Sequence, residues 1–235
     1  MWINYYARMR FIFNLLPQLK AAGDGGELSR VLSVLAAGAE NDIQLDDLGL
    51  KHNYTLQACL AHCVIMTDFM IEEFAKRYPT TAFSHSYPGD IKTGVIKIIS
   101  GPVRLAAKVL YTLVAPWLLN FRESGERNMF QLTNSIYSPR SGYCGTPKPD
   151  GIEFATGMDG VQRSGGYLVD WDGKVTGDAE VIAKYREQNA GPRIWEHTTN
   201  VFKSATRSKR PAEHEAEGSG RPPPYAPNLV NWRPA

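Results

Sequence analysis

A long helical segment between two short strand-like runs constrains the fold of this chain more than any other feature. Residues 54–78 carry apolar side chains at alternating spacings of four and three, which predicts one amphipathic helix. Residues 30–35 form an apolar run rich in β-branched residues, typical of a buried parallel strand, and residues 83–87 form a second β-prone run. Strand, helix and strand make a βαβ unit with a right-handed crossover. We therefore expect an α/β fold.

The second strand-like run stops at Pro88 and Gly89, with Ile91 and Thr93 just beyond. Proline cannot continue a strand ladder and glycine permits a positive φ, so the chain should turn sharply at the carboxyl end of this strand. Ligands bind at that end of an open α/β sheet. The turn is therefore the first candidate for a binding loop.

The remaining amino-terminal and central segments read mainly as helices. Residues 2–20 are apolar on nearly every side, which predicts a buried helix that Pro17 should kink or weaken. Residues 94–140 have a helical pattern broken by glycine and prolines, and include an amphipathic stretch at 123–133. Because this region follows the ligand side of a strand, we expect a lid over the binding site.

The carboxyl-terminal segments predict a small hairpin and further helices over residues 151–203. Residues 152–156 and 167–171 are its two strand candidates, and Asp172-Gly173 is a turn signal. Asp178 can cap one helix and Pro192 can open another. Residues 204–235 turn to charge, glycine and proline, so we expect one domain over 1–203 followed by a disordered tail.

Composition argues against several classes of partner. The 235 residues carry a formal net charge of only +2, with scattered basic residues, so we expect no nucleic-acid partner. The longest uncharged apolar run, 109–121, is shorter than the roughly 20 residues that cross a bilayer, so we expect no transmembrane segment. Three cysteines, Cys59, Cys63 and Cys144, cannot all pair and indicate reduced thiols in a cytoplasmic protein.

Two histidines invite a metal or catalytic interpretation. Cys59, His62 and Cys63 are close on one helix, but they are flanked by apolar residues and no second ligand pair appears, so we expect no metal. His85 falls on a buried strand, where it is predicted to be a core histidine with its hydrogen bonds satisfied.

In the tail, residues 221–225 (RPPPY) resemble the PPxY motif of WW-domain ligands, a minor partner hypothesis.

With these segments in order, most of residues 2–203 resemble short-chain dehydrogenase/reductases, most closely fungal members with retinol-dehydrogenase-like sequences. Residues 3–19 resemble the helix that begins with an active-site asparagine, here Asn4, and the helix from Tyr54 resembles the one that carries Tyr-x-x-x-Lys. Residues 87–93 match the family's cofactor loop. The cofactor contacts implied by that match are Pro88, Gly89, Ile91 and Thr93.

The resemblance implies an NADP-dependent oxidoreductase, with NAD as the alternative cofactor. Its substrate would be a small hydrophobic metabolite that carries a carbonyl or an alcohol, in fungal secondary metabolism such as mycotoxin biosynthesis. Tyr54 would act as the catalytic acid or base, and Asn4 would support it. The helices at 2–20 and 54–78 are the faces through which such enzymes commonly pair, so a homodimer is a further expectation.

The sequence also departs from the family at essential positions. No glycine-rich phosphate-binding turn precedes the first helix, so the fold expected is a partial Rossmann-like doubly wound sheet without its phosphate-binding strands. Ala36 stands at the catalytic serine position, with Ser33 three residues earlier. Ala58 stands four residues after Tyr54, where the family has lysine.

A second alignment of the helix does not restore the missing groups. It moves the tyrosine and lysine positions to Leu60 and Val64, and the nearest lysine in sequence is Lys51. A lysine ammonium is what lowers the tyrosine pKa toward neutrality, so its loss weakens proton transfer. Two functions follow from the sequence: an oxidoreductase, or a catalytically inactive relative that serves as a binding or scaffold subunit.

Overall fold

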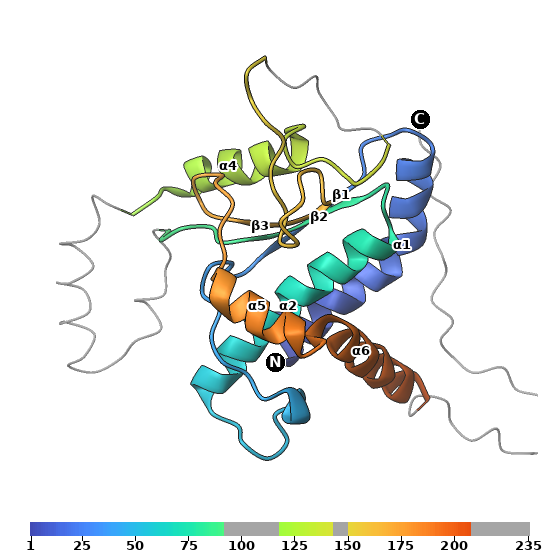
Figure 1. Ribbon diagram of the computed structural model, residues 1–235, viewed down its shortest axis with the longest axis vertical. Helices are drawn as coiled ribbons and strands as arrows, with labels where there is room; N and C mark the ends of the chain where they lie inside the picture. The colour runs from blue at the N-terminus through green and yellow to red at the C-terminus, as the bar shows by residue number, and fades with distance from the viewer. Residues whose placement is uncertain (92–117, 143–149, 208–235) are drawn as a thin grey trace, which may run out of the picture.

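The computed structural model describes residues 1–91, 118–142 and 150–207, and these form three parallel strands with helices on both sides (Figure 1). Strands β1 (Arg30–Val34), β2 (Ala82–Ser86) and β3 (Gly166–Val169) lie in the order β1-β2-β3. All residues of β2 and β3 are buried. Strands buried on both faces are typical of a parallel sheet covered by helices. The expected α/β fold is confirmed.

The predicted βαβ unit forms as the spacing indicated. Helix α2 (Leu56–Arg77) connects β1 to β2, and Arg30 to Val34 align with Ala82 to Ser86 in parallel register. Thr55 caps the helix, because its hydroxyl oxygen accepts a hydrogen bond of 3.0 Å from the backbone N–H of Ala58. Residues 61–75 of α2 are all buried. This helix is therefore the centre of the fold and has no broad exposed face.

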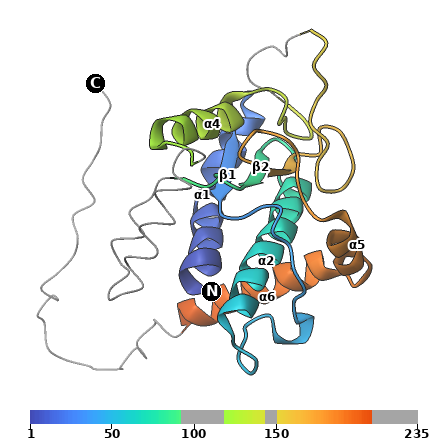
Figure 2. The ribbon, with the colours of Figure 1, turned by 90° about the vertical axis from the view of Figure 1, so that its left-hand side faces the viewer.

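The helices form layers around the sheet (Figure 2). Helix α4 (Phe121–Thr133) covers one face, while α1 (Arg8–Asp24) and α2 cover the other. Helices α5 (Ala179–Glu187) and α6 (Ala190–Arg207) follow β3, and α6 packs across α2. Residues 61–75 of α2 are therefore buried within the chain itself, and the homodimer stays a prediction.

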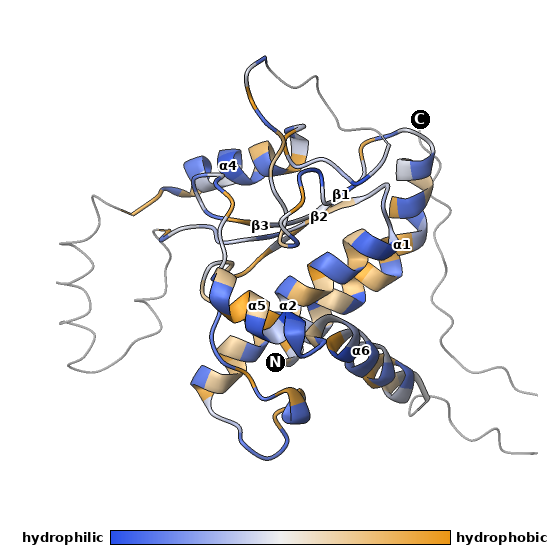
Figure 3. Cartoon of the chain, viewed as in Figure 1, coloured by the Kyte–Doolittle hydropathy of each residue, from blue (hydrophilic) through white to orange (hydrophobic). Residues whose placement is uncertain are grey.

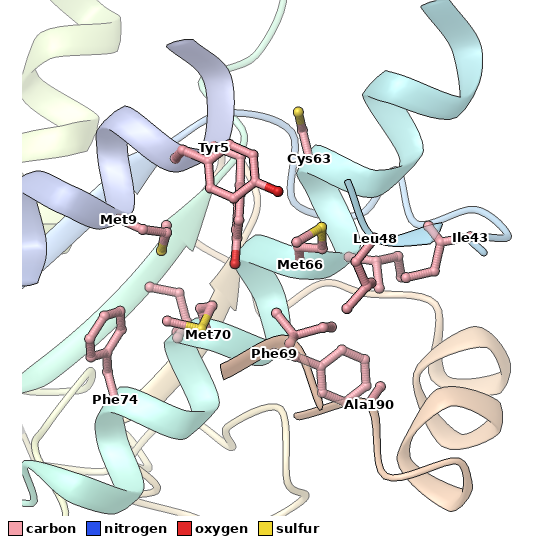
Figure 4. Packing of buried hydrophobic residues seen from close by; sticks show 14 of the residues in the cluster. Tyr5, Met9, Ile43, Leu48, Cys63, Met66, Phe69, Met70, Phe74 and Ala190 are labelled. Carbon is pink, nitrogen blue, oxygen red and sulfur yellow. The ribbon is translucent and has the colours of Figure 1, made fainter. Parts of the chain in front are cut away.

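The main hydrophobic core lies between α1, α2 and α6. Figure 3 shows hydrophobic residues along most of α2, whereas α4 and α6 carry both hydrophobic and hydrophilic residues. Tyr5, Met9, Met66 and Met70 gather at the crossing of the amino-terminal segment with α2 (Figure 4). Phe74, fully buried on α2, contacts aromatic rings from three other elements. This core holds the amino and carboxyl ends of the described chain on one side of the sheet.

The amino-terminal helix is longer than predicted. A π-helical turn, Trp2–Ala7, leads into α1, which passes through Pro17 and ends at Asp24. Proline removes one backbone hydrogen bond, but Met9, Ile12 and Leu16 anchor the buried side of α1 in the core. Burial of that side offsets the loss of the hydrogen bond, so the helix does not stop at Pro17.

The predicted hairpin between 152–156 and 167–171 is wrong. Strand β3 pairs in parallel with β2, and residues 152–156 contribute only an isolated bridge from Thr156 to Gln162. The turn at Asp172-Gly173 does form, and the chain returns directly after it, since the Thr176 N–H donates to the Leu168 carbonyl at 3.0 Å. Alternation of large residues resembled a half-exposed strand, but both faces of β3 are buried.

The remaining predictions concern the cap of α5, the end of the domain and segments outside the described residues. Asp178 caps α5 as predicted, with its carboxylate accepting from the N–H groups of Glu180 and Val181. Helix α6 continues to Arg207, past the expected domain boundary at 203. Residues 92–117 of the predicted lid, the tail from 208 and Cys144 lie outside the described residues. Among the helices that are described, none is long and apolar enough to cross a membrane.

Candidate functional site

The turn after β2 has the shape that its sequence predicts. Gly89 has a φ of +79°, and a Cβ built on it would lie 2.5 Å from Leu119 Cδ1 and 3.0 Å from Trp171 Cβ. Ile91 forms a parallel bridge with Leu119, and the Leu119 N–H donates to the Asp90 carbonyl at 2.8 Å. The turn is therefore fixed against the segment that enters α4 and against Trp171, two residues after β3, at the carboxyl edge of the sheet.

Replacing Gly89 by alanine is expected to lower the free energy of unfolding by about 1–3 kcal/mol, since it adds backbone strain and a clash with Leu119. Urea unfolding measures the change. The matched control is Gly125→Ala in α4, where an added Cβ meets nothing within 4 Å, and a gain of about 0.5–1 kcal/mol is expected. Equal effects at the two sites would contradict the tight packing of the turn.

A buried polar pair joins α2 to the same end of the sheet. His85 and Asp68 are both fully buried, with His85 Nδ1 2.5 Å from Asp68 Oδ1. The backbone N–H of Ala36 donates to His85 Nε2 at 3.1 Å, so the ring proton sits on Nδ1 and is donated to Asp68. His85 is thus the satisfied core histidine that the sequence predicted. At the position expected for a catalytic serine, the chain uses its backbone to hold this ring.

Burial disfavours the charged form of Asp68. Burial raises the pKa of Asp68 to about 6, His85 opposes that rise, and the nearby carboxyl of Glu40 adds to it. Glu40 itself is buried and accepts hydrogen bonds from the N–H groups of Gly38 and Asp178, at 2.8 and 2.9 Å. Since neither His85 nor Asp68 is exposed, the pair positions the strand ends rather than contacting a ligand.

A cavity of about 570 Å³ lies where the amino-terminal segment, the approach to α2 and α6 meet. We call it the Lys51 pocket. Its lining residues are Met1, Trp2, Tyr6, Gly49, Lys51, Tyr54, His197, Asn200, Val201 and Ser204. Ligand sites commonly have volumes of about 300–1,000 Å³ and mostly apolar walls with a few polar groups, and this cavity fits that description.

Tyr54 and Lys51 are therefore neighbours in space, although they do not have the family's spacing in sequence. Yet the pKa of the exposed Tyr54 is raised, chiefly by Cys59, rather than lowered toward neutrality. Within the pocket, Tyr6 Oη lies 2.7 Å from His197 Nε2. Burial raises the pKa of Tyr6 to about 12, while burial and then Lys51 lower the pKa of His197. Both groups of this pair are neutral at neutral pH.

The structure separates the predicted site residues into two places. Pro88, Gly89 and Ile91 form the turn at the sheet edge, and Thr93 lies outside the described residues. Tyr54 lines the Lys51 pocket, which neither Asn4 nor the turn lines. Asn4 is half-buried on the π-helical turn that also carries Tyr6. These residues are not brought together as one catalytic group.

Sequence reasoning missed His197 and gave Lys51 little weight. His197 lies 191 residues after Tyr6, its hydrogen-bond partner, and no local pattern marks it. Only the docking of α6 brings it to the pocket. Among the described residues, no group of three or more histidine, cysteine or acidic residues could hold a metal ion, and the described cysteines, Cys59 and Cys63, are free and buried.

A second, smaller cavity of about 320 Å³ runs between α1 and the outer edge of β1. Phe11 and Leu15 of α1 line it and are 70% and 52% exposed. Ser33 also lines it, and its hydroxyl has no hydrogen-bond partner in the described part of the chain. Ser33 therefore lies beside the strand edge, while Ala36 follows the strand end near His85.

Comparison with known proteins finds named oxidoreductases that are similar to this chain in sequence. No family model matches the chain. Oxidoreductase AN1596 of Emericella nidulans is 37% identical over 207 residues, which are 86% of this chain and 61% of that protein. Oxidoreductase andH of Emericella variicolor is 32% identical over 213 residues, 89% of this chain and 62% of that protein. The chain thus spans about three fifths of the length of these curated relatives.

A further relative carries a family name. Short-chain dehydrogenase/reductase SAT2 of Stachybotrys chartarum is 25% identical over 211 residues, 84% of this chain and 56% of that protein. A solved NADPH-bound carbonyl reductase from chicken fatty liver overlaps with a TM-score of 0.41 and 14% identity, covering 74% of this chain and 54% of that one. That overlap is too low to argue from. The curated relatives are thus named oxidoreductases and include a short-chain dehydrogenase/reductase, which fits the superfamily that the sequence resembles.

Proposed function

We propose that this chain is part of an NAD(P)-dependent oxidoreductase that reduces a carbonyl or oxidises an alcohol on a small hydrophobic metabolite. NADP is the favoured cofactor, and fungal secondary metabolism, including mycotoxin biosynthesis, is the favoured setting. The observation that carries the proposal is 37% identity to a named oxidoreductase over 86% of the chain. The turn at Pro88 and Gly89 supports it, because it lies where such sheets bind ligands.

The cofactor fits this chain only in part. The turn at Pro88, Gly89 and Ile91 could contact the nicotinamide end of a dinucleotide, with Thr93 beyond it. The space beside Gly89 is filled by Leu119 and Trp171, however, so the glycine there serves packing. The sequence holds no glycine-rich turn for the pyrophosphate. The residues of this chain do not provide a complete dinucleotide site, and we derive no hydride-transfer step from them.

A binding or scaffold subunit without catalysis is the second candidate. Ala58 and Ala36 replace the family's lysine and serine, and the pKa of Tyr54 is raised rather than lowered. A tyrosine in this state is a poor proton donor or acceptor near pH 7. The same α/β scaffold with its Lys51 pocket could still bind a metabolite or a partner protein.

A thermal-melt titration of the 235-residue chain with NADPH and NADH tests the leading proposal. A cofactor at about 100 times its dissociation constant stabilises the folded state by roughly 2.7 kcal/mol, which raises the melting temperature visibly. Stabilisation by NADPH above that by NADH is the expected result. A cooperative melt that neither cofactor moves would favour the scaffold subunit. If a cofactor binds, Tyr54→Phe separates catalysis through Tyr54, which it would abolish, from binding, which it would leave unchanged.

A further inference from the structure

The Lys51 pocket combines apolar walls with two cations, the Lys51 ammonium and the amino-terminal ammonium of Met1, which donates to Cys59 Sγ at 3.1 Å. Trp2 and Tyr54 line it and are 65% and 63% exposed, so large aromatic surfaces are open to solvent there. Lys51 is the only lysine or arginine among the lining residues, and none of them is acidic. Within the described chain, the Lys51 ammonium forms no ion pair. The Lys51 ammonium beside exposed aromatic rings favours binding of an anionic ligand with an apolar body.

His197 adds a directed donor to this charge. We assign the Tyr6 O–H as the donor to His197 Nε2, which leaves the ring proton on Nδ1. No hydrogen bond to Nδ1 from the described chain occupies that proton. Lys51 and His197 both lie against Gly49, since a Cβ built there would be 3.8 Å from Lys51 Cε and 3.8 Å from His197 Cε1. One oxyanion could therefore receive both.

We propose that the Lys51 pocket binds a small carboxylic acid with an aromatic or polycyclic body. The carboxylate would lie between Lys51 and His197, and the body would lie against Trp2, Tyr54 and Val201. Asn200 and Ser204, which line the α6 side, offer polar groups for a second substituent. This binding does not depend on the proposed oxidoreductase activity.

Calorimetric titration with naphthalene-2-carboxylate and with naphthalene-2-carboxamide, which is neutral and nearly the same shape, tests the proposal in the absence of nicotinamide cofactor. The full chain is expected to bind the acid at least about tenfold more tightly than the amide. In Lys51→Met this preference should disappear. In the control Lys203→Met, which removes an exposed lysine of α6 outside the pocket, it should persist.

Three results would overturn the proposal: no binding of the acid at millimolar concentration, equal affinity for acid and amide, or a preference that survives Lys51→Met. Lys51 is exposed, so the variant should fold, and its melting temperature checks this. Salt gives a readout that needs no variant, because raising it from about 20 to about 500 mM should weaken binding of the acid and not of the amide. Loss of NADPH binding would leave these results unchanged, so the two proposals can fail separately.

Discussion

Phe74→Ala is expected to lower the free energy of unfolding by about 3–5 kcal/mol, a large share of the stability of a domain this size. Phe74 is fully buried and its ring centroid lies 5.1 Å from that of Phe13, 5.3 Å from that of Phe83 and 5.3 Å from that of Trp195. These partners belong to α1, β2 and α6, so one cavity would loosen three elements that pack around this ring. Urea unfolding followed by circular dichroism measures the change.

The matched control is Phe121→Ala at the start of α4, where the ring is 68% exposed. A change within about 0.5 kcal/mol is expected there. For a described domain of this length, the Phe74 variant should also melt roughly 6–20 °C lower. A loss of less than about 1 kcal/mol at Phe74 would mean that α6 does not pack on α2 as the structure shows.

His85→Leu is the second change with a large expected effect. Leucine fills much of the same volume but removes the donor to the buried Asp68 carboxylate and the acceptor for the Ala36 N–H. Removing the histidine leaves the buried Asp68 carboxylate without its donor, an uncompensated buried charge that costs about 3–5 kcal/mol, and we expect a loss of that size at neutral pH. His52→Leu is the control, because His52 is exposed, and a change within about 0.5 kcal/mol is expected.

The pH dependence of this loss distinguishes it from simple repacking. The folded-state pKa of Asp68, about 6, lies above its unfolded value of about 3.9, so the folded chain holds the Asp68 proton more tightly. The contribution of Asp68 to stability therefore falls as the pH rises from about 4 to about 6. Without His85, which opposes the rise in that pKa, ionisation becomes costlier and the loss should grow between about pH 5 and pH 8.

Asp68→Asn provides the complementary test of the same pair. An amide oxygen can still accept from His85 Nδ1, and no buried charge remains, so the fall in stability between about pH 4 and pH 6 should become smaller than in the unmodified chain. Combining Asp68→Asn with His85→Leu should recover part of the loss seen for His85→Leu alone. Identical pH profiles for the single and double variants would contradict the role assigned to Asp68.

The parts of the fold that the sequence predicted are those fixed by local pattern. The apolar spacing over residues 54–78 located α2 to within two residues at its start and one at its end. Asp178 marked a helix cap because its carboxylate can accept from backbone N–H groups, and Gly89 marked a turn because glycine permits a positive φ. Strand β3 was placed in a hairpin because four residues cannot distinguish a half-buried edge from a fully buried parallel strand.

The functional site was harder to predict because its members come together only through tertiary packing. Lys51 precedes α2, and His197 lies on α6, which joins the pocket from the opposite end of the described chain. The resemblance agrees with the names of the curated relatives, but it pointed to Tyr54 as part of a local dyad that this sequence lacks. The structure gives Tyr54 different neighbours, and these could not be inferred from spacing along the helix.

The order β1-β2-β3 leaves the outer side of β1 without a strand partner among the described residues, next to the exposed Phe11 and Leu15 of α1. The Arg8 guanidinium donates to the Val34 carbonyl of this strand. A strand edge beside apolar side chains is a template onto which another extended segment can add. Self-association through this template competes with solubility whenever the chain is concentrated. What covers β1 therefore matters for the behaviour of the chain at high concentration, in addition to the stability of the core.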